Sequence, residues 1–231
     1  MTSRNYMPNG KVNGHEVAES LDVNVKSNLT PDYETPLKPD AFAMPDEEKL
    51  DLIEAHFREI MDILGLDLQD DSLRGTPRRV AKMFVKEIFQ GLNPKNKPKI
   101  SLFENKYQYR QMLVERNITV KSFCEHHFLP IYGKAHIAYI STGKVIGLSK
   151  LNRVVEYFSR RPQVQERLTV QIANELKRIL KTEDVAIYIE AKHMCVQMRG
   201  VEHDHSDTVT AEYSGKFLNE NTRAEFLQTI K

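Results

Sequence analysis

The chain has 231 residues, enough for one large domain or two small ones with a substantial core. Apolar residues make up 40% and charged residues 28%, an ordinary composition for a globular protein that excludes a disordered or fibrous class. The net charge of +1 gives no overall reason to expect a nucleic-acid partner, because binding to a phosphate backbone requires a strongly basic face. Any anion binding must therefore depend on a local cluster of charge.

No targeting or membrane segment is expected. The first residues lack the apolar core of a signal peptide, and no run approaches the roughly 18 uninterrupted apolar residues of a membrane span. We therefore predict a cytoplasmic protein with no membrane partner. In that reducing compartment, Cys124 and Cys195 are better suited to thiol or metal chemistry than to a structural disulfide.

Three regions are predicted in chain order. Residues 1–44 are rich in Asn, Asp, Pro and Thr without a sustained period, and we expect them to form a flexible N-terminal arm. Residues 45–98 are expected to form an N-terminal helical region, and residues 99–231 a domain of strands and helices that carries the chemistry.

The helical region is predicted to contain two amphipathic helices. Apolar residues recur at helical spacing over residues 45–66, with acidic residues in the first turn. A second pattern covers residues 75–92, with Thr76 as the N-cap, Pro77 at the first helical position and Gly91 near the end.

Strand and helix patterns alternate along the rest of the chain. A period near two and many β-branched or aromatic residues predict strands over 117–128, 133–142, 184–200 and 207–217. Helical spacing predicts helices over 149–161, 162–181 and 222–230. The order of two strands, two helices and two strands after the initial helices predicts an α+β fold with an antiparallel sheet.

The strand pattern that ends at Arg199 predicts one half of a metal site. Side chains alternate along a strand, so His193, Cys195 and Arg199 share one face if the strand is unbroken. Ile187 and Ile189 lie on the same face, which therefore begins as core and becomes polar at one end.

Cys124 and His127 in "SFCEHHFLPIYG" predict the other half. Residues three apart lie on opposite faces of a straight strand but come together in a tight turn, so the chain should bend here. With Cys195 the donor set becomes Cys2His, which suits the borderline-soft zinc ion. Three protein ligands leave one position open, as in catalytic zinc sites.

Other interpretations of these residues stay open. His126 or His193 could complete a structural Cys2His2 site, and the cysteines could instead be plain buried residues. A cysteine beside a histidine could also be a nucleophile, although "FCEHHF" lacks the local signatures of thiol proteases. His203 and His205 could bind a metal too, but an exposed polar loop explains them better.

Several segments together resemble one known family. "CEHH", "VIGLSKLNR", "RPQVQERL" and "HMCVQMRG" resemble, in that order and at matching spacing, the signature stretches of GTP cyclohydrolase I, and "DDSLRGTPRRVAKMF" is similar to that family too. The resemblance covers about residues 45–231. It implies a zinc-dependent hydrolase that opens the guanine imidazole ring of GTP, releases formate and forms 7,8-dihydroneopterin triphosphate, the first step of tetrahydrofolate and pterin biosynthesis.

The resemblance also implies roles for the residues of the metal site. One Zn2+ per subunit is expected on Cys124, His127 and Cys195. His126 is implied as the acid/base residue over the purine, and His193 as a second proton-handling group near the ribose. The histidine next to the ligand His127 therefore acquires a catalytic rather than a metal-binding role.

Substrate-binding residues follow in the same way. Glu166 is implied for guanine; a carboxylate can accept hydrogen bonds from both N1–H and the exocyclic amine of that base. The residues implied around the triphosphate are Ser149, Lys150, Arg153, Arg199 and Arg79. Lys150 and Arg153 lie three apart near a predicted helix start, where exposed N–H groups favour anions.

The resemblance implies the tunnelling fold (T-fold), an antiparallel sheet with helices on one face whose sheets join into a barrel across subunits. Four main strands per chain leave edges that must be paired or covered. We expect a homodecamer of two pentamers with active sites at subunit boundaries. The rivals are a non-catalytic guanine-nucleotide or pterin-binding module with structural zinc, and the tunnelling-fold nitrile reductase of queuosine synthesis, which lacks this zinc set.

Overall fold

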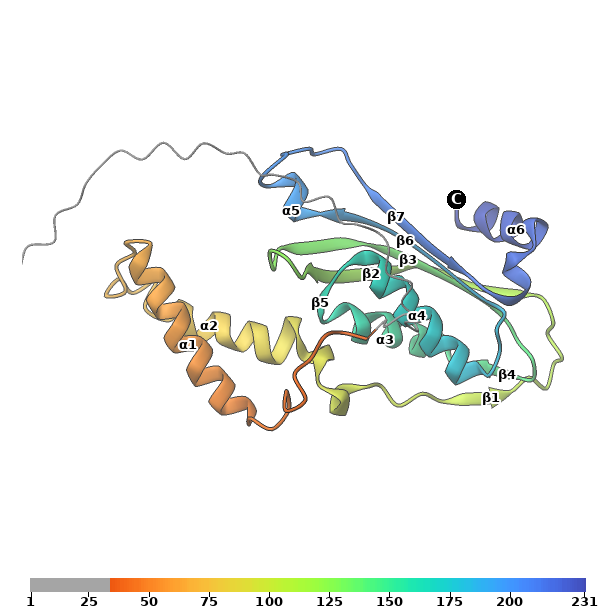
Figure 1. The fold of residues 1–231 in the computed structure, drawn as a ribbon. Helices are drawn as coiled ribbons and strands as arrows, with labels where there is room; N and C mark the ends of the chain where they lie inside the picture. The colour runs from red at the N-terminus through yellow and green to blue at the C-terminus, as the bar shows by residue number, and fades with distance from the viewer. Residues whose placement is uncertain (1–33) are drawn as a thin grey trace, which may run out of the picture. The chain divides into compact units, whose positions relative to one another are not determined.

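The structure, a computed structural model, describes residues 34–231. The predicted N-terminal arm, residues 1–44, therefore lies mostly outside the described residues. Positions 34–44 form turns that lead into the first helix (Figure 1). Within residues 34–231, none of the helices combines the length and the apolarity needed to cross a lipid bilayer.

The N-terminal helical region begins as predicted. Helix α1 (Asp46–Ile63) follows Pro45, and three acidic side chains occupy its first turn, where their negative charges interact favourably with the positive end of the helix dipole. Helix α2 (Thr76–Lys82) has Pro77 in its first turn, but its N-cap is Gly75 rather than Thr76. The preceding turn explains the shift, because the Thr76 N–H already donates to the Leu73 carbonyl, 2.9 Å away.

The second predicted helix does not continue as a single α-helix. A π-helical segment (Met83–Ile88) follows α2, and a 3-10 turn (Gln90–Leu92) ends the run. Packing explains where the run ends: Gly91 lies so close to the carbonyl of Tyr157 that a Cβ atom would clash there. Its N–H also donates to the Arg160 carbonyl, 2.9 Å away, so a contact remote in sequence sets the end of the helix.

A five-stranded sheet with the order β5-β2-β3-β6-β7 forms the centre of the fold (Figure 1). Its antiparallel strands are β2 (Met112–Cys124), β3 (Pro130–Ile140), β6 (Val185–His193) and β7 (Thr208–Tyr213), as predicted. Strand β5 (Pro162–Gln163) pairs in parallel with β2, and β1 (Leu102–Glu104) and β4 (Lys144–Ile146) form a separate two-stranded sheet. These three strands are too short to produce a detectable period.

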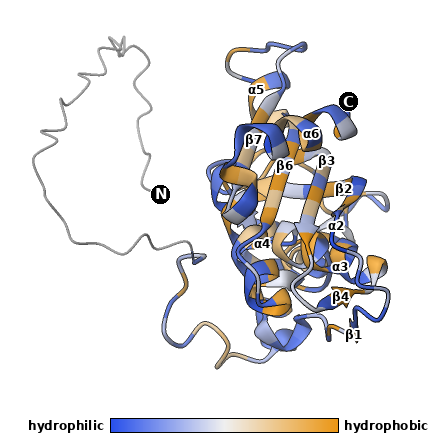
Figure 2. Ribbon diagram, turned by 90° about the vertical axis from the view of Figure 1, so that its right-hand side faces the viewer, coloured by the Kyte–Doolittle hydropathy of each residue, from blue (hydrophilic) through white to orange (hydrophobic). Residues whose placement is uncertain are grey.

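Helices α3 (Leu148–Ser159) and α4 (Gln165–Leu180) cover one face of the sheet (Figure 1). The main core lies between them and the strands, and Figure 2 shows hydrophobic residues on both layers. Its fully buried members include Leu151, Leu168, Ile137 and Ile187, which burial of apolar surface stabilises.

The opposite face departs from the predicted arrangement of helices on one face only. Helix α6 (Glu220–Ile230) covers one end of that face, and Phe226 together with Phe217 packs on Ala138 and Ala186. Alternation explains this second core, because these alanines point away from the face that α3 and α4 cover.

The prediction of an unbroken strand to Arg199 is wrong. Strand β6 ends at His193, and the chain then forms the short helix α5 (Met194–Gln197). The pairing of His193 with Ile131 is the last one in the β3–β6 ladder, because β3 starts only one residue earlier at Pro130. Without a partner strand, the backbone beyond His193 satisfies its hydrogen bonds locally.

Candidate metal centre and active site

The bend predicted between Cys124 and His127 is present. Strand β2 ends at Cys124, and a tight turn over Glu125–His127 reverses the chain into β3. The N–H of Phe128 donates to the Cys124 carbonyl at 2.8 Å, and Phe128 adopts a left-handed conformation with φ of 54°. The turn therefore brings two side chains three residues apart to the same side of the chain.

The donor atoms of Cys124, His127 and Cys195 all lie within 4.8 Å of one another. Helix α5 supplies Cys195, so a helical turn rather than a strand face carries it into the cluster. Sγ of Cys124 lies 3.8 Å from Nδ1 of His127. Ligands of a tetrahedral zinc ion, at bond lengths of about 2.0 to 2.3 Å, are roughly 3.5 to 3.8 Å apart, so this donor set fits such an ion.

The electrostatics of this cluster also favour a bound cation. Burial raises the pKa of the Cys195 thiol, and the hydrogen bond and charge of Cys124 raise it further, because two adjacent thiolates repel each other. A divalent cation reverses this preference by stabilising both thiolates. Nη1 of Arg199 lies 2.9 Å from Nε2 of His127, so the predicted phosphate-binding guanidinium is next to the cluster.

His126 lies beside the cluster but is not one of its three members. Its Nδ1 is 3.7 Å from Sγ of Cys124, its side chain is 64% exposed, and its Nε2 is 3.8 Å from Oε1 of Glu125. Glu125 in turn forms an ion pair with Arg167 at 2.6 Å. The hydrogen bond from Arg167 holds the pKa of Glu125 below its ordinary value, so an ionised carboxylate adjoins the His126 ring.

His193 occupies the end of β6 beside the first turn of α4. Its Nε2 lies 2.8 Å from Oε1 of Gln165. Burial lowers the pKa of His193, while the negative charge of Glu166 acts in the opposite direction. The predicted guanine-binding carboxylate and the second predicted proton-handling group are therefore electrostatic neighbours, and Glu166 is exposed to solvent.

The cations predicted on α3 are remote from this cluster within the chain. Asn152, next to Arg153, is 3.4 Å from the Glu115 carboxylate on β2. At about 3.3 Å per residue, the strand from Glu115 to Cys124 spans roughly 25 to 30 Å. Ser149 and Lys150 occupy the first turn of α3, so they too belong to the far end of β2.

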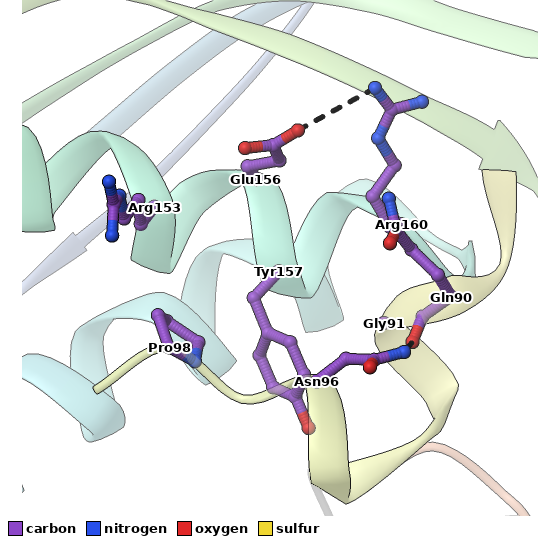
Figure 3. A pocket seen from close by; sticks show the side chains of 8 residues that line it. All are labelled: Gln90, Gly91, Asn96, Pro98, Arg153, Glu156, Tyr157 and Arg160. Atoms are coloured by element: carbon purple, nitrogen blue, oxygen red, sulfur yellow. Dashed lines mark hydrogen bonds and ion pairs between the residues drawn. The ribbon is translucent and has the colours of Figure 1, made fainter. Parts of the chain in front are cut away.

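Arg153 lines a separate cavity of about 400 Å³ (Figure 3). Figure 3 shows the ion pair between Glu156 and Arg160, 3.7 Å apart, at this cavity. No member of the metal cluster lines it. Arg79 on α2 donates to the Ser72 carbonyl, 3.4 Å away.

Three residues that contact the predicted catalytic histidines directly or through one intermediate side chain did not emerge from the sequence. Gln165, Arg167 and Glu125 are sequence neighbours of the residues identified in "VQERL" and "CEHH". Adjacency was the only available signal, because their roles depend on contacts with partners 28 and 42 residues away.

The histidine-containing loop after Arg199 forms no metal cluster. Over residues 34–231, only Cys124, His127 and Cys195 form a group of donors with metal-site spacing. Nε2 of Gln197 donates to the carbonyl of Asp204, 3.0 Å away, within this loop. His203 and His205 are both exposed in this loop.

Comparison with known proteins points to one family. The family model for GTP cyclohydrolase I matches residues 53–231. A GTP cyclohydrolase 1 of Flavobacterium johnsoniae is 58% identical over 211 residues, which cover 91% of this chain and 95% of that protein. Proteins of the same name from Aeromonas hydrophila and Escherichia coli are 53% and 51% identical over 199 residues, 86% of this chain and 90% of each relative. The chain belongs to the GTP cyclohydrolase I family.

Proposed function

We propose that this chain hydrolyses the imidazole ring of guanine in GTP, releases formate and forms 7,8-dihydroneopterin triphosphate. The observation that carries this proposal is the Cys124, His127 and Cys195 cluster, with donor atoms within 4.8 Å of one another, His126 beside it and His193 two residues before Cys195 in the chain. Family membership supports the same reaction. The products supply the start of tetrahydrofolate and pterin biosynthesis.

The metal in this proposal is one Zn2+ per subunit on those three side chains. Two thiolates and one imidazole form a donor set that zinc prefers, and three ligands leave the fourth position free for water. When bound, zinc lowers the pKa of water to about 7 and so supplies a nucleophile at neutral pH. The two free cysteines also fit a reducing cytoplasmic environment.

His126 is proposed as the acid that protonates the purine ring nitrogen as the ring opens. Its imidazole is mostly exposed and directly follows the turn residue Glu125, so a bound base can reach it. Imidazole groups exchange protons near neutral pH, which suits a general acid or base. The Glu125 carboxylate, anchored by Arg167, provides a negative partner on one side of this ring.

Glu166 and His193 are proposed to act on the base and the ribose respectively. An ionised Glu166 can accept from two adjacent N–H groups of guanine, a pattern that adenine does not offer. His193, near Glu166, is assigned the proton transfers that open the ribose before the final ring closure.

The triphosphate is proposed to bind between subunits. Arg199 belongs to the metal end of the chain, which is the end of the sheet that carries the metal cluster. The α3 residues assigned to the triphosphate lie near the opposite end of β2 in the same chain; they are Ser149, Lys150 and Arg153. A neighbouring subunit can bring its α3 to the metal end, which the chain alone does not do. Arg79 is assigned to the same phosphate site on the strength of the family resemblance.

An assembly of ten subunits, two pentamers face to face, is the oligomer that we propose. Strand β7 is an edge of the five-stranded sheet, and its outer backbone groups have no partner strand among the described residues. Exposed edges favour pairing with another chain, and closure into a barrel removes them. Light scattering that returned an active monomer would exclude this assembly.

The decisive experiment is incubation of the metal-loaded protein with GTP. Formate is measured enzymatically, and neopterin fluorescence is measured after oxidation, with and without a chelator. We expect both products in the loaded protein and neither after chelation. Tight GTP binding without formate would instead support a non-catalytic nucleotide-binding module, and unchanged GTP would refute the proposed activity.

The His126→Ala variant separates the two histidines of "CEHH". We expect it to retain zinc and GTP binding but to lose turnover, because only His127 is proposed as a ligand. Loss of the metal in this variant would show that the ligand assignment is wrong.

A further inference from the structure

The side chain of Gln165 connects His193 to strand β7. Gln165 begins α4 and is only 1% exposed. Its Nε2 lies 3.2 Å from the Ile189 carbonyl, 2.9 Å from the Thr208 carbonyl and 3.1 Å from the Thr210 hydroxyl. Its Oε1 lies 2.8 Å from Nε2 of His193. One buried amide therefore contacts β7, the backbone of β6 and the histidine at the end of β6.

These contacts determine which end of the amide faces the imidazole. Carbonyl oxygens only accept, so the amide nitrogen must face Ile189 and Thr208; the flipped amide would place its oxygen against two other oxygens. The oxygen of Gln165 therefore faces His193, and the ring must donate from Nε2. A neutral imidazole that carries its proton on Nε2 has its free lone pair on Nδ1.

We propose that Gln165 is a positioning residue that holds the His193 ring in one orientation and in the Nε2–H tautomer, with its free lone pair on Nδ1. The expected effect on turnover rests on the proposed function, whereas the tautomer follows from the contacts of the chain itself. Because Gln165 is anchored to both β6 and β7, the orientation of the ring is set before substrate binds.

The first test compares two variants. Gln165→Met keeps the length of the side chain but removes its hydrogen bonds, and we expect kcat to fall about 10- to 100-fold with KM changed less than about twofold. Thr169→Val is the matched structural control. The Thr169 hydroxyl contacts the Thr210 hydroxyl at 2.7 Å and the backbone carbonyl of Gln165 at 2.8 Å. Its loss weakens the link between α4 and β7 but removes neither partner of the contact between Oε1 of Gln165 and Nε2 of His193.

We expect Thr169→Val to keep kcat within about twofold of the native value, even where its Tm falls as far as that of Gln165→Met. Equal losses of kcat in the two variants would reduce Gln165 to a structural role. Native kcat in a folded Gln165→Met variant would overturn the proposal as well.

The second test reads the tautomer without turnover. Solid-state nitrogen NMR of the full protein labelled with 15N-histidine distinguishes the two neutral tautomers, and the signals of His193 are those absent from a His193→Ala spectrum. We expect a proton on Nε2 in the native protein and a shifted or mixed population in Gln165→Met. An Nδ1–H ring in the native protein would overturn the proposal, whether or not the variants fold. Failure of native protein to release formate would refute the proposed function but leave this NMR result standing.

Discussion

The metal end of the sheet and the start of α3 gather their functional side chains in different ways. At the metal end, Cys124 and Cys195 are far apart in sequence but close in space, because β2 and β6 both pair with β3 and end at the same side of the sheet. At the start of α3, Lys150 and Arg153 are neighbours simply because residues three apart share a helix face.

The contrast shows how the proposed site is divided. One chain supplies the whole metal cluster and both proposed proton-handling histidines. The cations of α3 are separated from these residues by most of the length of β2. In the proposed function, a nucleotide that binds both sets therefore lies where two chains meet. The following predictions test this division, beginning with the largest expected effect.

Replacing a proposed zinc ligand should abolish metal binding and, with it, turnover. For Cys195→Ser, we expect loss of bound zinc and a decrease in formate release of at least about 1,000-fold, because the nucleophile depends on the metal. Elemental analysis and the formate assay measure the two losses. Cys195 lies on the short helix α5 and is only partly buried, so circular dichroism should still report a folded protein. Undiminished turnover without zinc would contradict the ligand assignment.

Mixing two inactive variants should restore activity if the site spans two chains. His126→Ala removes the proposed catalytic acid at the metal end, and Arg153→Ala removes a proposed phosphate-binding residue on α3. In a co-expressed mixture, an intact metal end should meet an intact α3 at roughly a quarter of the subunit boundaries. The formate assay measures the recovery relative to each variant alone. The matched control is a mixture of His126→Ala and Cys195→Ser, which both damage the metal end and should show no recovery. A mixture of the first pair that stayed inactive would place the whole site within one chain.

Arg167 should affect turnover through Glu125 and His126. In Arg167→Met the Glu125 carboxylate loses its 2.6 Å partner, and the pKa of Glu125 should return toward its ordinary value. We expect kcat to decrease about tenfold with zinc content unchanged, since the affected histidine is not a proposed ligand. Loss of zinc together with kcat would indicate that Arg167 holds the metal-binding turn instead.

The buried Glu175 carboxylate on α4 should affect stability rather than turnover. Burial alone raises the pKa of Glu175, but hydrogen bonds and charges from Arg178 and Lys97 outweigh it, so the net shift is downward. The stabilisation is therefore present above the ordinary pKa of 4.5 and is lost as pH falls through the lower folded value.

For Glu175→Gln we expect about 1 to 2 kcal/mol less stability at pH 7, and a much smaller difference from the native protein near pH 3. Urea denaturation at the two pH values measures this effect. The value of kcat should not change, because Glu175 contacts none of the proposed catalytic residues. A difference that grew toward low pH would reverse the assigned direction of the pKa shift.

Much of the fold was predictable because its signals are local. The stripe of α3 and the alternation of β2 and β6 arise from residues a few positions apart, and the structure has a helix or a strand at each of these positions, although β2 begins earlier and β6 ends earlier than predicted. The bend at Cys124 was predictable for the same reason, since side chains three residues apart point to opposite faces of a straight strand and converge there only if the chain turns. The end of the second helix was not, because Gly91 there packs against backbone that lies far along the chain.

The sequence by itself determined the chemistry that is available: two cysteines and a group of histidines, a carboxylate in "VQERL" and a pair of cations at a helix start. The tertiary structure decided how these groups meet. It ended β6 at His193, placed Cys195 on a helical turn, joined His193 to Gln165 and separated α3 from the metal cluster. These outcomes depend on strand pairing and on buried hydrogen bonds between segments remote in sequence, and no local pattern encodes such contacts.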